Sequence, residues 1–192
     1  MSAIVELMDF TTDAEFKLGL YSSICYDSNK IDIESCIKRT QHCKDKGHLS
    51  VLRFASAVFK VSGISRVCLA QLTRSKHLDY LVRSSRYCEE NNAEFYRPES
   101  FYSMSDELKK KWADHENKSK ILYDELRSEK ITKQDARFVL PQSQETELYI
   151  VGNFNAWRDF IALRTSNAAQ SEVRQVALMI QEELRKVSPN IF

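Results

Sequence analysis

A short basic segment in the middle of the chain, residues 71–87, carries the side chains best suited to bind an anion. Its cationic and hydroxyl-bearing residues are Arg74, Lys76, Arg83, Arg86, Ser75, Ser84 and Ser85. Guanidinium groups donate paired N–H bonds to phosphate oxygens, and a lysine adds a point charge. A solvated basic turn is the alternative interpretation, because short basic clusters are common on protein surfaces. The residue types predict a ligand that bears a phosphate.

The composition points to a small anionic ligand and not to a polymer. The 192 residues include 28 basic and 27 acidic ones, which leaves a net charge of +1. Proteins that bind nucleic acid in general show a strong basic excess, which is missing here. Hydrophobic residues at 43% and charged residues at 29% are ordinary for a globular protein. We therefore expect no nucleic-acid polymer as a partner.

The N-terminal residues and the cysteines predict a cytoplasmic protein. Residues 1–16 lack the basic start of a signal peptide, and no apolar run reaches the roughly 18 residues of a membrane span. Five scattered cysteines, an odd number, indicate free thiols in a reducing compartment. Cys36 and Cys43 are seven residues apart and share a helix face, and with His42 and His48 they fit no usual zinc spacing. We expect neither a metal site nor a membrane contact.

Hydrophobic patterns and capping residues predict a helix-rich α+β fold, with residues 1–192 forming a single domain around a small mixed sheet. Strands are expected over residues 3–10, 51–61 and 147–151, and an extended or looped segment over 79–88. Thr12 and Asp32 are expected to cap helices over 13–26 and 33–46, the second ended by Gly47. Ser105 should begin a long helix with one apolar face. The residues expected on that face are Leu108, Trp112, His115, Leu122 and Leu126. Further helices are expected over 64–73, 135–140, 155–164 and 170–186.

The basic segment also has a family resemblance. Arg74-Ser75-Lys76 is followed by seven residues, then Ser84, and then Ser85-Arg86-Tyr87. This resembles the signature of the flavin-dependent thymidylate synthases, which reads Arg-His-Arg, seven residues, Ser, and Arg-Tyr shortly after. Four further segments are similar to family motifs in the same order: 22–26 (SSICY), 47–54 (GHLSVLRF), 135–141 (DARFVLP) and 163–172 (Leu-Arg, then Gln and Glu).

The resemblance implies a complete reaction. Members of this family convert dUMP to dTMP, with methylenetetrahydrofolate as the carbon donor and reduced FAD as the hydride donor. NADPH usually reduces the flavin. The family is of the methyltransferase class and forms homotetramers whose active sites lie between subunits. The cofactor does the redox chemistry, while the protein binds and positions.

The positions that contact the nucleotide in the family are well matched in this chain. The resemblance assigns substrate binding to Gln71, Arg74, Ser84, Ser85, Arg86, Arg137 and Arg164. Arg164 aligns with the arginine that contacts the pyrimidine and favours its ionised form, and it is the expected catalytic residue. A permanent positive charge stabilises negative charge on the ring. The alternatives are a surface ion pair for Arg137 and a charge that offsets the helix dipole for Arg164.

The flavin positions are matched less completely. The resemblance assigns cofactor binding to His48, Ser50, Arg74, Lys76, Asn153 and Asp159. Of these, Asp159 stands where the family has Asn, and its carboxylate would repel a flavin diphosphate. Family residues are also replaced at Ser75, Val82, Arg53, Phe54, Asn155 and Ala168. His77, next to Lys76, is a candidate to replace the histidine of the signature. The sequence therefore predicts a flavin pocket that is rebuilt or weakened.

Three hypotheses follow from this pattern. The first is an active, divergent flavin-dependent thymidylate synthase. The second is a related pyrimidine-nucleotide enzyme with altered chemistry, such as hydroxymethylation, which needs no final hydride. The third is a nucleotide-binding homologue without catalysis. The retained nucleotide positions favour the first.

Overall fold

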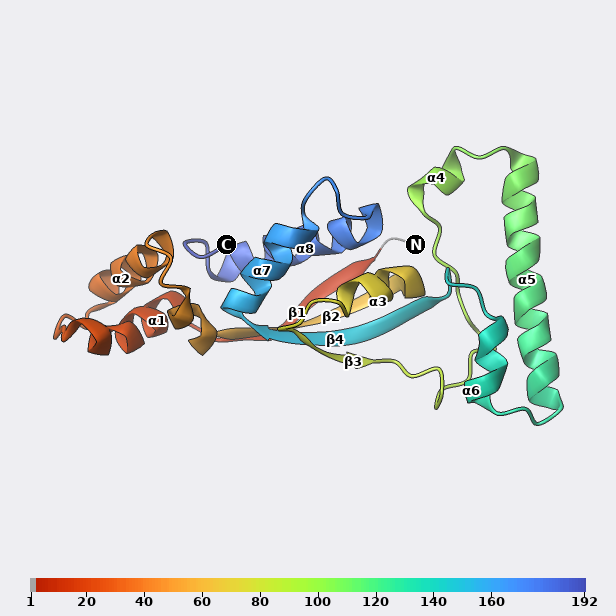
Figure 1. Cartoon of the computed structure of the whole chain (residues 1–192), viewed down its shortest axis with the longest axis horizontal. Coiled ribbons are helices and arrows are strands. Elements are labelled where there is room, and N and C mark those ends of the chain that lie inside the picture. Colours follow the sequence, from red (N-terminus) through yellow and green to blue (C-terminus); the bar gives the residue numbers. More distant parts are fainter. Residues whose placement is uncertain (1–2) are drawn as a thin grey trace.

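The fold is built on a four-stranded antiparallel sheet with helices packed on one face (Figure 1). The computed structural model describes residues 3–192. The strands are β1 (Ile4–Phe10), β2 (Ser56–Ser65), β3 (Asp79–Val82) and β4 (Glu145–Asn153), in the spatial order β1-β2-β4-β3. The predicted helix-rich α+β class is confirmed. The predicted mixed sheet is wrong, because all three pairs of neighbouring strands run antiparallel.

Three helices cover one face of the sheet and form the core with it. They are α3 (Arg66–Leu72), α7 (Phe154–Arg164) and α8 (Ser171–Val187), close to the helices predicted there. The rings of Phe59 in β2 and Trp157 in α7 meet at 5.0 Å with an interplanar angle of 75°. The Trp157 Nε1 also donates to the Ala57 carbonyl at 3.1 Å, so the buried indole has its hydrogen bond. This packing fixes α7 against β2.

The opposite face of the sheet has no helix over it (Figure 1). Leu81 in β3 is directly opposite Tyr149 in β4, and both side chains are exposed, Leu81 at 76%. Val151, two residues along β4, is also exposed and lies on the same face. We call Leu81, Tyr149 and Val151 the open face of the sheet. An exposed apolar patch of this kind marks an interaction surface more often than scattered apolar residues do.

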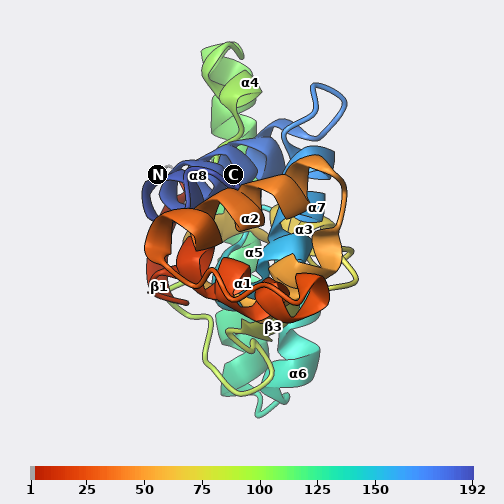
Figure 2. The ribbon, with the colours of Figure 1, turned by 90° about the vertical axis from the view of Figure 1, so that its left-hand side faces the viewer.

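A helical layer follows β1 at one end of the molecule. It contains α1 (Ala14–Ser22), the 3₁₀ turn η1 (Ser23–Tyr26), α2 (Ile33–Asp45) and the 3₁₀ turn η2 (Leu49–Phe54). Asp32 caps α2 as predicted, since its side chain accepts from the Ser35 N–H at 2.9 Å. Gly47 ends α2 with a left-handed φ of 74°, also as predicted. The α1 and α2 helices pack side by side (Figure 2).

Two predictions in this layer are wrong. Thr12 does not cap α1; Asp13 precedes the helix with no side-chain cap, and the Thr12 hydroxyl accepts from Lys17 Nζ at 3.1 Å. The segment 51–61 is not one strand, because its first four residues belong to η2. Val51 and Leu52 are buried there by packing on α1 and α7, so their β propensity is overridden by tertiary contacts.

The remaining helices stand beside the sheet and extend past it (Figures 1 and 2). They are α4 (Glu99–Tyr102), α5 (Asp106–Ser128), α6 (Lys133–Ala136) and the 3₁₀ turn η3 (Arg137–Val139). Ser105 caps α5 as predicted, accepting from Leu108 N at 3.3 Å. The predicted apolar face of α5 is wrong. Its buried residues are Glu116, Ser119 and Tyr123, because polar contacts attach this helix to the rest of the chain, and Leu108 and Leu122 are exposed.

Two findings concern thiols and membranes. All five cysteines are free, as predicted, and Cys36, Cys43 and Cys68 are buried. Within residues 3–192, no helix combines the length and the apolar character needed to cross a bilayer.

Candidate active site

Gln71 and Arg164 meet at the ends of two helices of the covered face. Arg164 is the last residue of α7, and its Nη2 donates to the Gln71 carbonyl at 2.8 Å while Nη1 lies 3.5 Å from Gln71 Oε1. The Nε of Arg164 is buried with no hydrogen-bond partner among the described residues. Buried polar groups normally have partners. We call this pair the Arg164 cluster; it has a donor free for a ligand.

Tyr80 belongs to β3 and ties this strand to the end of α3, next to the Arg164 cluster. Its hydroxyl donates to the Leu72 carbonyl at 2.7 Å and lies 3.3 Å from the Ser75 carbonyl. The end of α3 is therefore tied to β3 as well as to α7.

A second cluster forms where the chain leaves β3. Arg137 of η3 donates through Nη1 to the buried Ser85 Oγ at 3.0 Å, and through Nε to the Gln134 carbonyl at 3.1 Å. The Arg86 N–H donates to Ser84 Oγ at 3.3 Å, and the exposed Arg86 guanidinium lies 5.5 Å above the Tyr87 ring. The structure thus brings Ser84, Ser85, Arg86 and Arg137 into one region.

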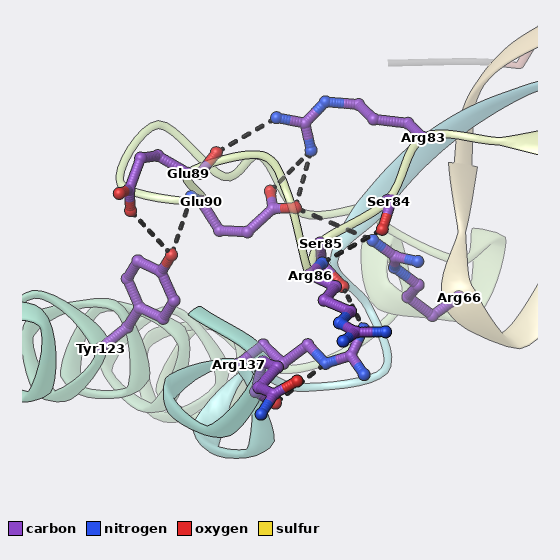
Figure 3. A network of polar contacts seen from close by, with 10 residues as sticks. Arg66, Arg83, Ser84, Ser85, Arg86, Glu89, Glu90, Tyr123 and Arg137 are labelled. Carbon is purple, nitrogen blue, oxygen red and sulfur yellow. Dashed lines mark hydrogen bonds and ion pairs between the residues drawn. The ribbon is translucent and has the colours of Figure 1, made fainter. Parts of the chain in front are cut away.

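Arg66, Arg83 and Glu90 belong to the same region (Figure 3). The sequence predicted Arg83 only as part of the basic segment, and Arg66 and Glu90 were missed. Arg83 Nη1 donates to both carboxylate oxygens of the buried Glu90, at 2.7 and 2.8 Å. Arg66 Nη2 lies 3.9 Å from Glu90 Oε1. We call Arg66, Arg83, Arg137, Ser85 and Glu90 the Arg66 cluster. The available signal for Arg66 was a single arginine inside an apolar segment, ISRVCLA.

The two clusters lie toward opposite ends of α3. Arg66 begins this helix, and Gln71 is next to its last residue. Five residues of α-helix rise about 7 Å. A mononucleotide can bridge such a distance between its base and its 5′-phosphate.

Two of the predicted cofactor residues, Asn153 and Asp159, lie where β4 passes into α7. Asn153 caps α7, with its Oδ1 accepting from the Ala156 N–H at 2.9 Å, so its amide NH₂ stays available as a donor. The Asp159 carboxylate is exposed, and its Oδ2 accepts from Asn155 Nδ2 at 3.3 Å. The end of η2 is bound to the same junction, because the Phe154 N–H donates to the Ala55 carbonyl at 2.8 Å.

His48 and Ser50 come from the segment that leads into this junction. Ser50 lies exposed in η2. The exposed His48 precedes η2, with its Nδ1 3.2 Å from the Tyr26 hydroxyl.

The loop between α3 and β3, residues 73–78, lies against the same junction. A Cβ built on Gly152 would be 2.2 Å from Leu78 Cδ2, so only glycine allows Leu78 to pack there. Arg74, Lys76 and His77 are exposed on this loop, and among residues 3–192 no hydrogen bond or ion pair holds Arg74 or Lys76. The charges of Arg74 and Lys76 are therefore available to a ligand.

The sequence matches the family described as thymidylate synthase complementing protein over residues 6–190, nearly the whole chain. The chain belongs to the flavin-dependent thymidylate synthase family.

Several relatives bear the name flavin-dependent thymidylate synthase. That of Mycobacterium sp. (strain KMS) is 36% identical over 170 aligned positions, covering 79% of this chain and 67% of the relative. That of Mycolicibacterium gilvum (strain PYR-GCK) is 33% identical, covering 96% of this chain and 82% of the relative. The Mycobacterium tuberculosis (strain ATCC 25177 / H37Ra) protein is 34% identical over 79% of this chain.

The chemistry of the donors at the β4–α7 junction fits the diphosphate of a flavin nucleotide. Arg74 and Lys76 supply two charges that nothing else in the described residues uses, and Asn153 and Ser50 supply neutral donors. Asp159 is not suited to the diphosphate because its charge has the same sign. Its carboxylate, which already accepts from Asn155, can only accept further hydrogen bonds.

Proposed function

We propose that this chain converts dUMP to dTMP, with methylenetetrahydrofolate as carbon donor and reduced FAD as hydride donor. NADPH is the proposed reductant of the flavin. The whole chain acts as one domain, in a reducing compartment such as the cytoplasm, where its free cysteines would persist. The family membership supports the reaction class. The observation that carries the substrate is the pair of arginine clusters at the two ends of α3.

Each cluster suits one end of the nucleotide. The phosphate needs several charged donors and a hydroxyl, which Arg137, Ser85, Ser84 and Arg86 supply. The uracil ring needs a cation that stabilises its ionised form, which Arg164 supplies. The Arg164 contact with the Gln71 carbonyl orients the guanidinium before the substrate arrives, so less conformational entropy is lost on binding.

The cofactor has a separate place. Arg74, Lys76, Ser50 and Asn153 would hold the flavin nucleotide, with His48 and Asp159 at its border. When bound, the flavin supplies the reducing equivalents of the reaction. The protein's own task is to hold the nucleotide base near it and to keep water out.

We further propose that the enzyme is a homotetramer with active sites shared between subunits. The open face of the sheet and the exposed apolar residues of α5 support this, because these apolar side chains are exposed to solvent in one chain. The exposed arginines Arg74 and Arg86 would then meet ligands held partly by a neighbouring subunit.

Turnover of the purified protein tests the proposal. The protein is incubated with dUMP, methylenetetrahydrofolate, FAD and NADPH, and the nucleotide product is analysed by mass. Methylated dUMP supports the proposal. A hydroxymethylated product would indicate the altered chemistry, and dUMP binding without any product would indicate a non-catalytic homologue. Absorbance spectra with FAD, before and after dUMP, show separately whether the flavin is bound.

A further inference from the structure

A cavity of about 750 Å³ lies between α5 and the first residues of α3 and α8. Sites for small molecules in proteins have this size, roughly 300–1,000 Å³. None of the residues that line the cavity belongs to the set assigned to the nucleotide or the flavin. Its apolar walls come from three separate segments and consist of Val67, Tyr96, Pro98, Met104, Leu108 and Trp112.

The lining of this cavity includes one buried carboxylate, that of Glu172 in the first turn of α8. Its Oε1 accepts from the Ser65 N–H at 2.7 Å, and its Oε2 accepts from the Ser65 hydroxyl at 2.6 Å. Both donors are neutral, and no ion pair within residues 3–192 involves Glu172. Each carboxylate oxygen has two lone pairs, so each can accept one more hydrogen bond.

Two other carboxylates in the described part of the chain are as deeply buried, and each of them has an arginine. Glu90 accepts from Arg83 Nη1 at 2.7 and 2.8 Å. Glu116 accepts through Oε1 from Arg97 Nη1 at 2.6 Å, and its Oε2 contacts Arg97 Nη2. A buried charge without an opposite charge is costly. Glu172 is the member of this set that has a cavity beside it in place of an arginine.

Aromatic rings form part of the wall, and one of them is held rigidly. The Trp112 Nε1 donates to Glu116 Oε1 at 2.7 Å, and the indole packs edge-on against Phe101 at 5.7 Å. The Tyr96 hydroxyl stays neutral, because burial and then the negative charge of Glu172 raise the pKa of Tyr96 to about 12. The faces of aromatic rings carry partial negative charge and attract cations. The walls and the carboxylate therefore favour the same kind of ligand.

We propose that this cavity is a second ligand site, which binds a flat aromatic ring carrying an amidine or guanidine group. Two N–H groups of such a ligand would donate to the two oxygens of Glu172, the paired geometry that carboxylates favour. The ring would lie against the apolar walls. The exposed residues Lys111 and His115 also line the cavity from α5, so the positive end of the ligand belongs at Glu172 and not beside them.

Benzamidine is the probe that tests this proposal, because it is a small aromatic ring with a charged amidine. Benzamide has nearly the same shape without the charge, and benzoate carries the opposite charge. Calorimetric titration of the protein, without dUMP or FAD, gives the three affinities. We expect benzamidine to bind at least tenfold more tightly than benzamide, the usual effect of a hydrogen bond between charged groups, and benzoate not to bind.

Glu172→Gln keeps the shape of the side chain and removes its charge. It should bind benzamidine 10- to 100-fold more weakly than wild type does. Glu182→Gln is the matched control, because Glu182 is an exposed glutamate of the same helix, and it should leave the affinity unchanged.

Leu108→Trp is a second test that leaves Glu172 in place. Leu108 lines the cavity and is 53% exposed, so a larger ring there narrows the cavity without entering the core. The variant should bind benzamidine more weakly than wild type. It replaces Glu172→Gln if that variant does not show a native thermal melt.

Three results would overturn the proposal. They are no benzamidine binding by the wild type at millimolar concentration, equal affinity for benzamidine and benzamide, and unchanged affinity in a folded Glu172→Gln or, in its place, in Leu108→Trp. Displacement of benzamidine by dUMP or FAD would also overturn it, because the cavity would then belong to the site already described. Failure of the protein to bind dUMP would reject the proposed function alone, since the benzamidine titrations contain no nucleotide.

Discussion

Arg164 is the residue on which the proposed chemistry depends most. Its guanidinium is oriented by the Gln71 carbonyl and has a buried N–H to spare. Arg164→Lys keeps a charge but cannot reproduce the fork that reaches both Gln71 and a ligand. We expect kcat/KM for dUMP to fall by roughly 10²–10³-fold, the usual effect of removing a donor that stabilises developing negative charge.

The control for this prediction is Arg185→Lys, an exposed arginine in the last turn of α8. In steady-state kinetics, the kcat/KM of Arg185→Lys for dUMP should stay within about twofold of the wild-type value. Activity of Arg164→Lys close to wild type would remove Arg164 from the catalytic role.

At the scale of elements, α5 is fastened to the loop after β3 by charge. Glu89 accepts from Arg127 Nη2 at 3.0 Å and Nε at 3.2 Å, and from the Tyr123 hydroxyl at 3.1 Å. The hydrogen bond from Arg127 is the main reason that the pKa of Glu89 falls to about 2 from its ordinary 4.5. Because the folded pKa is the lower one, this contact stabilises the fold above pH ~4.5, and the contribution is lost as the pH falls to about 2.

Glu89→Gln should therefore melt at a lower temperature than wild type at pH 7, and the difference should shrink as the pH falls from about 4.5 to 2. Thermal melts followed by circular dichroism measure this difference in melting temperature. Glu107→Gln is the matched control, because Glu107 pairs with Lys111 on the exposed side of the same helix. The melting temperature of Glu107→Gln should be almost the same as that of wild type at every pH. A constant difference between wild type and Glu89→Gln would contradict the charge-based account.

The contact of α1 with α2 depends on Gly19, which has no side chain. A Cβ on Gly19 would lie 1.9 Å from the Cys36 carbonyl oxygen, a backbone atom that cannot turn away. Gly19→Ala should destabilise the protein toward the upper end of about 1–3 kcal/mol. That cost exceeds the gain of up to ~1 kcal/mol from alanine's helix propensity. Chemical denaturation measures the change, and equal stability would mean that the helices can separate without cost.

At the scale of the whole molecule, the open face of the sheet stands out, because its apolar side chains are exposed and no helix covers them. Leu81→Glu places a charge on this apolar face, opposite Tyr149. If the face is buried between subunits, the tetramer should dissociate and turnover should be lost, because the proposed sites are shared. Analytical ultracentrifugation and activity are measured on the same sample.

Leu178→Glu is the matched control, an exposed leucine on α8, which belongs to the helical layer on the other side of the sheet. It should leave the assembly intact. A tetramer that survives Leu81→Glu would place the interface elsewhere, and an active monomer would refute the shared site.

The sequence by itself determined the local structure and the family. Asp32, Gly47 and Ser105 act where they were predicted, because a cap depends on bonds within a few residues of itself. The signature around Arg74 pointed to the family that the full-length match shows, since motif spacing is visible in one dimension.

Only the tertiary structure decided which residues meet. Arg66 stands 17 residues before Arg83 and 71 before Arg137, and no local signal states that the start of α3, the end of β3 and η3 bring the three together near Glu90. The face by which α5 is attached was mispredicted for the same reason. Periodicity reports which residues are apolar, whereas Glu116 and Tyr123 are buried through polar partners supplied by distant segments. Burial of a polar side chain depends on its partners, and these are fixed only when the chain has folded.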